Sequence, residues 1–567
     1  MHIRLIVFLL AIGGGTLLKA QGLTSAKDAY QPVIVRESPG NEAKLIRLPD
    51  DTMQIFFIQR PEGRELRSIT SGDGGLTWSE EKLEIALPGE AYHAIQVVLD
   101  DQDELHAIFH IRGEGEKGYR GRHYNLWHAK TLAGRSRWSQ PRQFFEGYVG
   151  SIRGLTMLSS GRLLLAVAIA VPEREKPPEE GLVDYGWNDT VTFHSDDRGE
   201  TWTLGPARLR IPQDNTRGLT RYGGVEPYII ELRDGRVWML IRTKNGHLWE
   251  SFSSDGIDWS QPKPSKLISS DSPASVSRLS DGRLVMIFNA CQKWDDPKSY
   301  AIGGREVLHV AISADEGKTW LGLREILRDP RGAGKGDRGT AYGEIAETAD
   351  GKLLVVSGQG DGRRAVLLLD PGWLLETQAS DDFSHGARDW TMYDSSGAEV
   401  TAHPDDPARN ALRVRKVDPA TPAAAVWNFP AGASGEVRLR IRLKQGSAPA
   451  VLALTDHYSV AGDSKAHEHA VYRFELNTVM LKANQWHDAI IRWQAHGPAV
   501  LSVNGHHIQQ IEPLRKTDLH INYLRLMTAA VEVNDPGFAV EHVQVKVAPP
   551  QAQLAADATA ASSTGRH

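Results

Sequence analysis

The chain has 567 residues, of which 41% are hydrophobic and 54 are glycine, a composition typical of a turn-rich all-β protein. Its length predicts two or three domains. The formal net charge of −6 gives no reason to expect nucleic acid or an anionic membrane as a partner, so the prediction excludes both.

The N-terminus has the pattern of a secretory signal. Arg4 supplies a positive charge, residues 5–18 form an apolar stretch, and Ala20 is a small residue suited to cleavage. The apolar stretch is short and is broken by glycines at 13–15, which argues against a membrane anchor. We therefore predict a cleaved signal peptide over residues 1–20 and a secreted or periplasmic protein. Because Cys291 is the only cysteine, the exported fold must be held together without disulfides.

One short motif recurs along the first 320 residues. The pattern Ser-x-Asp-x-Gly-x-Thr-Trp occupies residues 71–78, 195–202 and 313–320; a copy one residue shorter lies at 253–259, and a worn copy surrounds Trp138. The closing tryptophans recur about every 60 residues, a period that indicates a propeller or a solenoid in a strand-rich chain. Asp and Ser accept hydrogen bonds from backbone N–H groups in tight turns, and the tryptophan can pack beneath such a turn.

A second repeat runs in phase with the first. Six apolar, strand-like runs each follow a turn, usually one that contains Asp-Gly, which is a hairpin signal. These runs are residues 52–57, 105–110, 162–170, 236–241, 283–288 and 352–358. Six runs predict six blades, with the last blade closed by the N-terminal strand so that few sheet edges stay open.

The repeated motif resembles the Asp-box of the sialidase superfamily. That resemblance implies an all-β fold with a six-bladed β-propeller, which we place at residues 21–376. It also implies that the boxes join the outer strands of each blade, far from any active site, so we assign them a structural role only.

The rest of the chain predicts a second all-β unit. Residues 380–548 contain several alternating strands and no Asp-box, and Trp486-His487 followed by a strand and by Asn504-Gly505 resembles a concanavalin-like or laminin-G-like sandwich of jelly-roll type. Such a domain either binds glycan or braces the propeller, and the sequence leaves both roles open. Residues 549–567 are rich in Ala, Ser, Thr and Gln, which predicts a disordered tail.

Four residues match the catalytic pattern of the sialidase superfamily in order and blade phase. Glu226 begins one predicted inner strand, and Arg242 ends the next strand. Arg305 precedes the fourth box, and Tyr342 precedes the last predicted blade. The resemblance implies that Tyr342 is the nucleophile, that Glu226 is its base, and that Arg242 and Arg305 bind a substrate carboxylate. Arginine suits this binding because its planar fork forms two parallel bonds to a carboxylate.

The sequence departs from that superfamily in the first blade. Asn41 stands where the superfamily has its first arginine, and we predict that Asn41 contacts substrate instead. The usual aspartate acid/base is not identifiable in residues 59–64, and the glutamate expected after the tyrosine's strand is absent from residues 357–360.

Histidine and arginine side chains in the second blade could take over part of the role of these missing residues. His93 begins an inner strand as Glu226 does, and imidazole is easily tuned for proton transfer near neutral pH, so we predict a catalytic role for it. His106 and His110 alternate with apolar residues and fit buried core positions equally well. Arg120 and Arg122 lie on a predicted loop and could line a groove for an anionic sugar.

These patterns predict an exported exo-glycosidase that acts on glycans containing an acidic sugar. Two alternatives stay open: a propeller lyase that cleaves uronate-containing polysaccharide, and a carbohydrate-binding propeller without turnover. We predict no cofactor, and no metal site because the histidines lack partners at ligand spacing. The expected partner is a glycan substrate.

Overall fold

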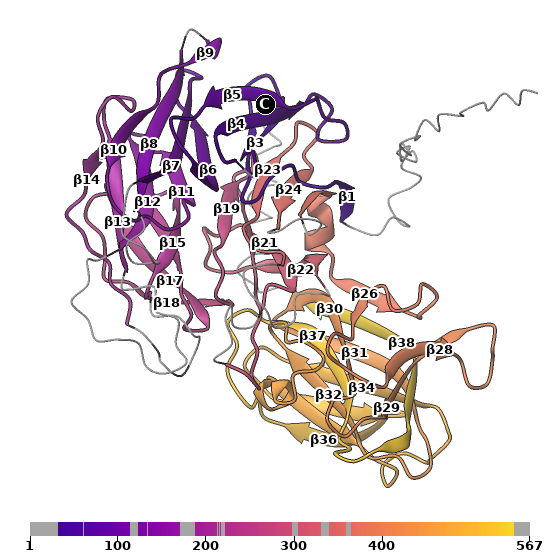
Figure 1. Cartoon of the computed structure of the whole chain (residues 1–567). Helices are drawn as coiled ribbons and strands as arrows, with labels where there is room; N and C mark the ends of the chain where they lie inside the picture. The colour runs from indigo at the N-terminus through magenta and orange to yellow at the C-terminus, as the bar shows by residue number, and fades with distance from the viewer. Residues whose placement is uncertain are drawn as a thin grey trace, which may run out of the picture.

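The computed structural model describes residues 32–60, 62–113, 123–132, 134–170, 188–212, 214, 216, 222–297, 304–329, 339–358 and 364–548, with only the backbone of His93. The predicted signal peptide, the predicted tail, Arg120 and Arg122 lie outside these residues, so the structure does not test them. The described residues form a six-bladed β-propeller followed by a β-sandwich, which confirms the predicted all-β fold class (Figure 1).

The first three blades are antiparallel sheets that follow one another along the chain. Blade one contains β2 (Lys44–Arg47), β3 (Met53–Ile58), β4 (Glu65–Ser71) and β5 (Lys82–Ala86). Blade two contains β6 (Ala91–Leu99), β7 (Leu105–Gly113), β8 (His123–Leu132) and β10 (Arg142–Phe145), with β9 (Arg137–Trp138) beside β8. Blade three contains β11 (Gly154–Met157), β12 (Leu163–Ala170), β13 (Asn188–Ser195) and β14 (Thr203–Leu204).

The last three blades continue the pattern and close the ring. Blade four contains β15 (Val225–Glu231), β16 (Val237–Arg242), β17 (His247–Ser253) and β18 (Lys263–Ile268). Blade five contains β19 (Ser275–Arg278), β20 (Leu284–Phe288), β21 (Val307–Ser313) and β22 (Leu321–Arg328). Blade six contains β23 (Glu344–Glu347), β24 (Leu353–Ser357), β25 (Ala365–Leu369) and β1 (Val33–Arg36). The pairing of β1 with β25 confirms the prediction that the N-terminal strand closes the last blade.

The first strand of each blade lies innermost. Strands β2, β6, β11, β15, β19 and β23 contact one another in ring order, and β23 returns to β2. The six strands share one register, because in each blade one inner-strand residue pairs with the fourth residue of the second strand. These equivalent inner residues are Lys44, Gln96, Gly154, Tyr228, Ser275 and Glu344.

The four box motifs are turns between the two outer strands of their blades. In the first box, Asp73 Oδ1 accepts hydrogen bonds from the backbone N–H groups of Leu76 and Thr77 at 3.1 and 2.9 Å. Trp78 Nε1 donates to the carbonyl oxygen of Gly75 at 2.9 Å and holds the turn from below. Gly75 has a φ of 96°, and a Cβ there would meet Leu354 Cδ1 of the neighbouring blade at 2.6 Å, so the position requires glycine.

The second unit is a sandwich of two antiparallel sheets, joined to the propeller by the 3₁₀ turn η1 (Pro371–Leu375). The larger sheet contains β26 (Gln378–Asp381), β28 (Ala398–Ala402), β29 (Asn410–Lys416), β31 (Ser434–Leu443), β34 (His487–Trp493), β35 (Ala499–Val503), β36 (His506–Ile511) and β38 (Asn534–Ala548). The smaller sheet contains β27 (Trp390–Thr391), β30 (Ala424–Gly432), β32 (Ala450–Thr455), β33 (Tyr472–Leu476) and β37 (Ile521–Thr528). A second 3₁₀ turn, η2 (Ala466–His469), precedes β33.

The smaller sheet of the sandwich packs against blade five. Tyr523 in β37 donates to Glu325 Oε1 at 2.6 Å, and its hydroxyl lies 2.6 Å from His309 Nε2. Burial lowers the pKa of His309 to about 3, so this imidazole is neutral. Its Nδ1 accepts from the backbone N–H of Ala290, so Nε2 carries the proton and donates to the tyrosine oxygen. Asn428 Nδ2 donates to the carbonyl oxygen of Leu323 at 3.2 Å. These buried polar bonds join the sandwich to blade five.

Among the described residues, no helix is long and apolar enough to cross a membrane.

The box turns provide a direct test of how the blades are held. We expect Asp315→Ala to lower the free energy of unfolding by about 1–2 kcal/mol, because Asp315 accepts bonds from the backbone N–H of Thr319, the hydroxyl of Thr319 and the hydroxyl of Ser313. Urea denaturation followed by tryptophan fluorescence measures the loss. Asp101→Ala, at an exposed position, is the control. Equal stability of the two variants would contradict a structural role for the box.

Candidate active site

Three polar residues occupy the same position at the start of different inner strands. Glu42, Glu226 and Tyr342 each lie two residues before one of the equivalent inner residues, in blades one, four and six. All three have a positive φ, of 48°, 48° and 63°. Such a backbone is costly for residues other than glycine and is concentrated at functional sites, so the position marks a candidate site at the propeller axis.

These blade starts bring a phenol and a carboxylate into contact. Tyr342 Oη donates to Glu226 Oε1 at 2.9 Å, across 116 residues of sequence. Arg242 Nη1 donates to the same hydroxyl at 2.7 Å and to Glu226 Oε2 at 2.6 Å. The Tyr342 and Glu226 side chains are almost fully buried, with the residues 4% and 8% exposed. The structure thus places three of the sequence-predicted residues in one hydrogen-bonded group.

Two further residues, which the sequence analysis did not identify, complete the surroundings of Arg242. Arg242 Nε donates to Asp271 Oδ1 at 2.8 Å, and Nη2 donates to Tyr222 Oη at 2.9 Å. Tyr222 in turn donates to Asp271. Arg242 therefore makes four hydrogen bonds within the protein. Because a guanidinium has five N–H groups, it cannot grip a substrate carboxylate with two parallel bonds unless one of these partners moves.

Two other guanidiniums face the ring of Tyr342. Arg305 Cζ lies 5.1 Å from the ring centroid, and Arg153 Cζ lies 5.7 Å from it. Arg305 Nη2 also donates to the carbonyl oxygen of Asp271 at 2.8 Å. The predicted residue Arg305 thus joins the group, and Arg153 is an addition from the start of β11. Positive charge beside a phenol favours the ionised phenolate.

Two of the equivalent inner residues, Lys44 and Glu344, belong to a second group of buried ion pairs. Lys44 Nζ binds Glu344 Oε2 at 2.7 Å, and Arg153 Nη2 binds Glu344 Oε1 at 2.9 Å. Arg153 also donates to the carbonyl oxygen of Gly343 at 2.7 Å and to Ser275 Oγ at 2.8 Å. These bonds join blades one, three, five and six. They therefore fix the inner strands that follow Glu42 and Tyr342.

The pKa values of the group follow from burial and from neighbouring charges. Burial raises the pKa of Glu226, and the charge of Arg242 opposes that shift only in part. Burial also raises the pKa of Tyr342 well above its usual range. For Asp271 burial acts in the same direction, but the charge and hydrogen bonds of Arg242 outweigh it and lower the pKa. Asp271 is therefore the fixed anion of the group, whereas Glu226 is the carboxyl poised to take up a proton.

Glu42 is a third carboxyl of the site that the sequence analysis missed. It is 2% exposed, and it accepts a hydrogen bond from Ser151 of blade three. The negative charge of Glu42 raises the pKa of both Glu226 and Tyr342, because a nearby anion disfavours the ionised form of a carboxyl group and of a phenol. Glu42 lies two residues before Lys44, as Glu226 lies two residues before Tyr228 and Tyr342 two residues before Glu344. This shared spacing is the signal that could have identified it.

The other predicted site residues lie elsewhere or outside the described side chains. Asn41 Oδ1 accepts a bond from Arg364 Nη1 at 2.7 Å. His93 lies in β6, and its side chain is not among those described, so its predicted role stays a prediction. The predictions for Arg120 and Arg122 also stay untested. His106 is buried between His128 and Asp100, at 3.0 and 3.1 Å, which fits the core alternative. Within the described ranges, no group of three or more His, Cys, Asp or Glu side chains could hold a metal ion.

Comparisons with known proteins agree with this architecture. Residues 90–355 match the family model of the BNR repeat-like domain. The matched segment carries three of the four box turns completely, and its repeats resemble those of the sialidase superfamily.

Solved structures give a more distant likeness. Trypanosoma rangeli sialidase is 13% identical in sequence, with 91% of this chain and 92% of that chain covered and a TM-score of 0.40. A protein of unknown function from Dyadobacter fermentans is 16% identical, with 59% and 96% covered and a TM-score of 0.45. A point mutant of NanB sialidase from Streptococcus pneumoniae is 13% identical, with 60% and 71% covered and a TM-score of 0.40. No curated protein sequence matches the chain.

The charge balance around Arg242 is open to a stability test. We expect Asp271→Asn to lower the free energy of unfolding by about 3 kcal/mol at neutral pH, because it removes one of two buried anions that pair with the guanidinium. Denaturant titration measures the change. The control is Asp234→Asn, which breaks the exposed Arg236–Asp234 pair and should leave stability unchanged. A stable Asp271→Asn variant would show that Glu226 alone balances the charge.

Proposed function

We propose that this protein is a glycoside hydrolase in which Tyr342 attacks the anomeric carbon of the substrate. One observation carries the proposal: the Tyr342 hydroxyl lies between Glu226 Oε1 at 2.9 Å and Arg242 Nη1 at 2.7 Å. The Glu226 carboxylate can accept the phenol proton, and the Arg242 guanidinium can stabilise the oxygen that loses this proton. A phenol has a pKa near ~10, so both partners are needed for attack near neutral pH.

The reaction runs in two steps. As the Tyr342 oxygen bonds to the anomeric carbon, its proton passes to Glu226 and the glycosidic bond breaks, while the leaving alkoxide takes a proton from an acid. Water then attacks the glycosyl-tyrosine, its proton returns to a base, and Tyr342 is released as the phenolate, which recovers its proton from Glu226. The charges of Arg242, Arg305 and Arg153 stabilise the phenolate where it forms.

The proposed substrate is a glycan with an acidic sugar at its end. The cationic side chains beside Tyr342 support this class, since they favour a substrate that carries a carboxylate. Arg305, which faces the Tyr342 ring, is one candidate to bind that carboxylate, and Arg242 could join it only if one of its four present partners moves. His93 is retained as the candidate acid for the leaving group. Export through the N-terminal signal is part of the same proposal.

The same residues would suit a lyase on uronate-containing polysaccharide. In that reaction, ionised Tyr342 removes the proton next to the carboxylate, and an arginine neutralises the carboxylate. The three guanidiniums near Tyr342 favour this second candidate as well, since they favour the phenolate form. The products separate the two reactions: elimination gives an unsaturated uronate that absorbs in the ultraviolet, and hydrolysis gives none.

Two variants test the nucleophile and its base. We expect Tyr342→Phe and Glu226→Gln each to lower kcat on an accepted acidic oligosaccharide by at least about a thousandfold, because each removes a group that acts in the transition state. A panel of acidic oligosaccharides is scored for new reducing ends and for ultraviolet absorbance. Arg236→Gln, which changes an exposed arginine on a hairpin, is the control. Full turnover by Tyr342→Phe sinks the proposal, and binding without any product supports a carbohydrate-binding propeller instead.

The pH profile tests the third carboxyl. Glu226 acts as a base only when ionised, so kcat should rise with pH through its raised pKa. Glu42→Gln removes a negative charge that raises this pKa, so the acidic limb of the kcat profile should move to lower pH. The measurement is kcat across about pH 4–8, with the conservative change Glu42→Asp as control. An acidic limb that stays in place would mean that Glu42 does not influence the base.

A further inference from the structure

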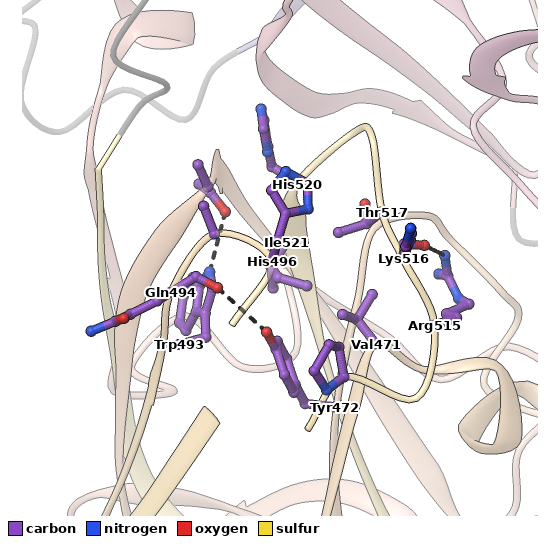
Figure 2. A pocket seen from close by; sticks show the side chains of 14 residues that line it. Val471, Tyr472, Trp493, Gln494, His496, Arg515, Lys516, Thr517, His520 and Ile521 are labelled. Atoms are coloured by element: carbon purple, nitrogen blue, oxygen red, sulfur yellow. Dashed lines mark hydrogen bonds between the residues drawn. The ribbon is translucent and has the colours of Figure 1, made fainter. Parts of the chain in front are cut away.

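The sandwich contains a pocket of about 310 Å³ (Figure 2). The two largest rings of its lining, Trp493 and Tyr472, are each 2% exposed and belong to the sandwich core, so no ligand can lie against them. We therefore assign this pocket no function. The sandwich contributes elsewhere, where it meets the loop that follows β20 in blade five. The first residue of that loop is Asn289.

Asn289 occupies in blade five the strand position that Arg242 occupies in blade four. In each blade, one residue of the second strand pairs with the equivalent inner residue, namely Leu240 in β16 and Ile287 in β20. Arg242 and Asn289 each follow that residue by two positions. Asn289 is fully buried, at 0% exposure, so its side chain acts on its protein neighbours and cannot touch a substrate.

The side-chain amide of Asn289 joins three segments of the chain. Nδ2 donates to the carbonyl oxygen of Val307 at 2.7 Å and to Thr340 Oγ1 at 3.0 Å. Oδ1 accepts from Ser272 Oγ at 2.8 Å. Because the carbonyl oxygen of Val307 can only accept, these bonds fix which amide atom is nitrogen and which is oxygen. Both amide protons and the amide oxygen are thus used inside the protein.

Each of these segments carries a residue of the candidate active site. The three residues that bond to Asn289 each lie one or two positions from Asp271, Arg305 or Tyr342. Thr340 also binds the second segment directly, because its N–H and its hydroxyl donate to the carbonyl oxygen of Arg305 at 2.7 and 3.0 Å. The hydroxyl of Thr340 therefore links Asn289 to the backbone of both the arginine and the tyrosine.

The sandwich fixes the loop that begins at Asn289. The N–H of Tyr458 donates to the carbonyl oxygen of Ala290 at 2.8 Å, and the N–H of Gln292 donates to the carbonyl oxygen of Tyr458 at 2.9 Å. These bonds lie directly beside Asn289 in the sequence. The sandwich thus braces the propeller at the residue that joins the three segments of the site.

We propose that Asn289 is a positioning residue, whose amide holds the backbone segments of Arg305 and Tyr342 where their side chains meet Arg242. Its expected effect on rate rests on the proposed function of Tyr342, whereas its effect on the placement of Tyr342 does not. A displacement of about 1 Å between reacting groups can lower a rate by about a hundredfold, so a loosened Tyr342 should react slowly even with every catalytic group present.

Kinetics of Asn289→Ala test the consequence for the reaction. The change removes three hydrogen bonds, so we expect kcat on an accepted acidic oligosaccharide to fall by about a hundredfold. Thr340→Val removes the linking hydroxyl and should also lower kcat, whereas Thr340→Ser keeps the hydroxyl and should retain the parent kcat. The matched control is Gln54→Ala in β3, which removes another buried amide, bonded to Ser68 Oγ at 2.9 Å. It should lower stability in urea without changing kcat.

A spectroscopic measurement separates this inference from the proposed reaction. When Tyr342 is replaced by 3-fluorotyrosine in the full chain, ¹⁹F NMR reports the surroundings of this one phenol without any substrate. We expect its resonance to move and broaden in Asn289→Ala and Thr340→Val, and to stay in place in Thr340→Ser and Gln54→Ala. If Tyr342→Phe retains turnover, the proposed function fails, but the resonance still decides the role of Asn289.

The fluorine resonance also defines what would overturn the inference. A resonance that stays in place in both Asn289→Ala and Thr340→Val means that the amide does not position Tyr342, whatever happens to kcat. An equal change in Gln54→Ala also overturns the inference, since any loss of a buried amide would then have the same effect. If Asn289→Ala does not fold, Thr340→Val and Thr340→Ser give the same decision.

Discussion

The candidate site depends on one buried guanidinium and its balance of charge. Arg242 is shared between the carboxylates of Glu226 and Asp271, and it also donates to the phenols of Tyr342 and Tyr222. A buried arginine is tolerated only when opposite charges and hydrogen bonds surround it, so these residues hold one another in place. The arrangement that stabilises the guanidinium is therefore the same one that brings a phenol to a carboxylate.

The ring of blades makes this meeting possible because it repeats one strand geometry around an axis. Each inner strand has the same register, so residues at one strand position face the axis at the same depth. Glu42, Glu226 and Tyr342 form the upper level, and the Lys44–Glu344–Arg153 ion pairs form the level below. In the lower level, Lys44 and Glu344 carry no proposed chemistry, and Arg153 links this level to Tyr342. The lower level supplies the rigid support that a preorganised site requires.

The sequence was sufficient to predict the architecture because its signals are local. An Asp-box needs only eight neighbouring residues, and the six strand-like runs that repeat in phase with it gave the number of blades. Glu226, Arg242, Arg305 and Tyr342 were predicted from their order along the chain, and the structure places them together.

The remaining site residues could not be found in this way. Tyr222, Asp271 and Arg153 reach Arg242 or Tyr342 only because the blades curve into a ring, and no local pattern encodes that approach. The pair Asn41 and Glu42 shows a second limit: both lie in the turn before β2, where Glu42 has a φ of 48°, and the sequence alone does not define how such a turn directs its two side chains.

The closing of blade six by β1 has a consequence for how the molecule assembles. The strand at the beginning of the propeller pairs with β25, so the last seam of the ring joins segments more than 300 residues apart. Contacts of such long range form late, after most of the chain has been ordered. Until then β25 presents an unpaired edge that another chain could occupy. The seam between β1 and β25 is therefore the point at which two molecules could exchange strands, and the place from which unzipping of the ring would begin.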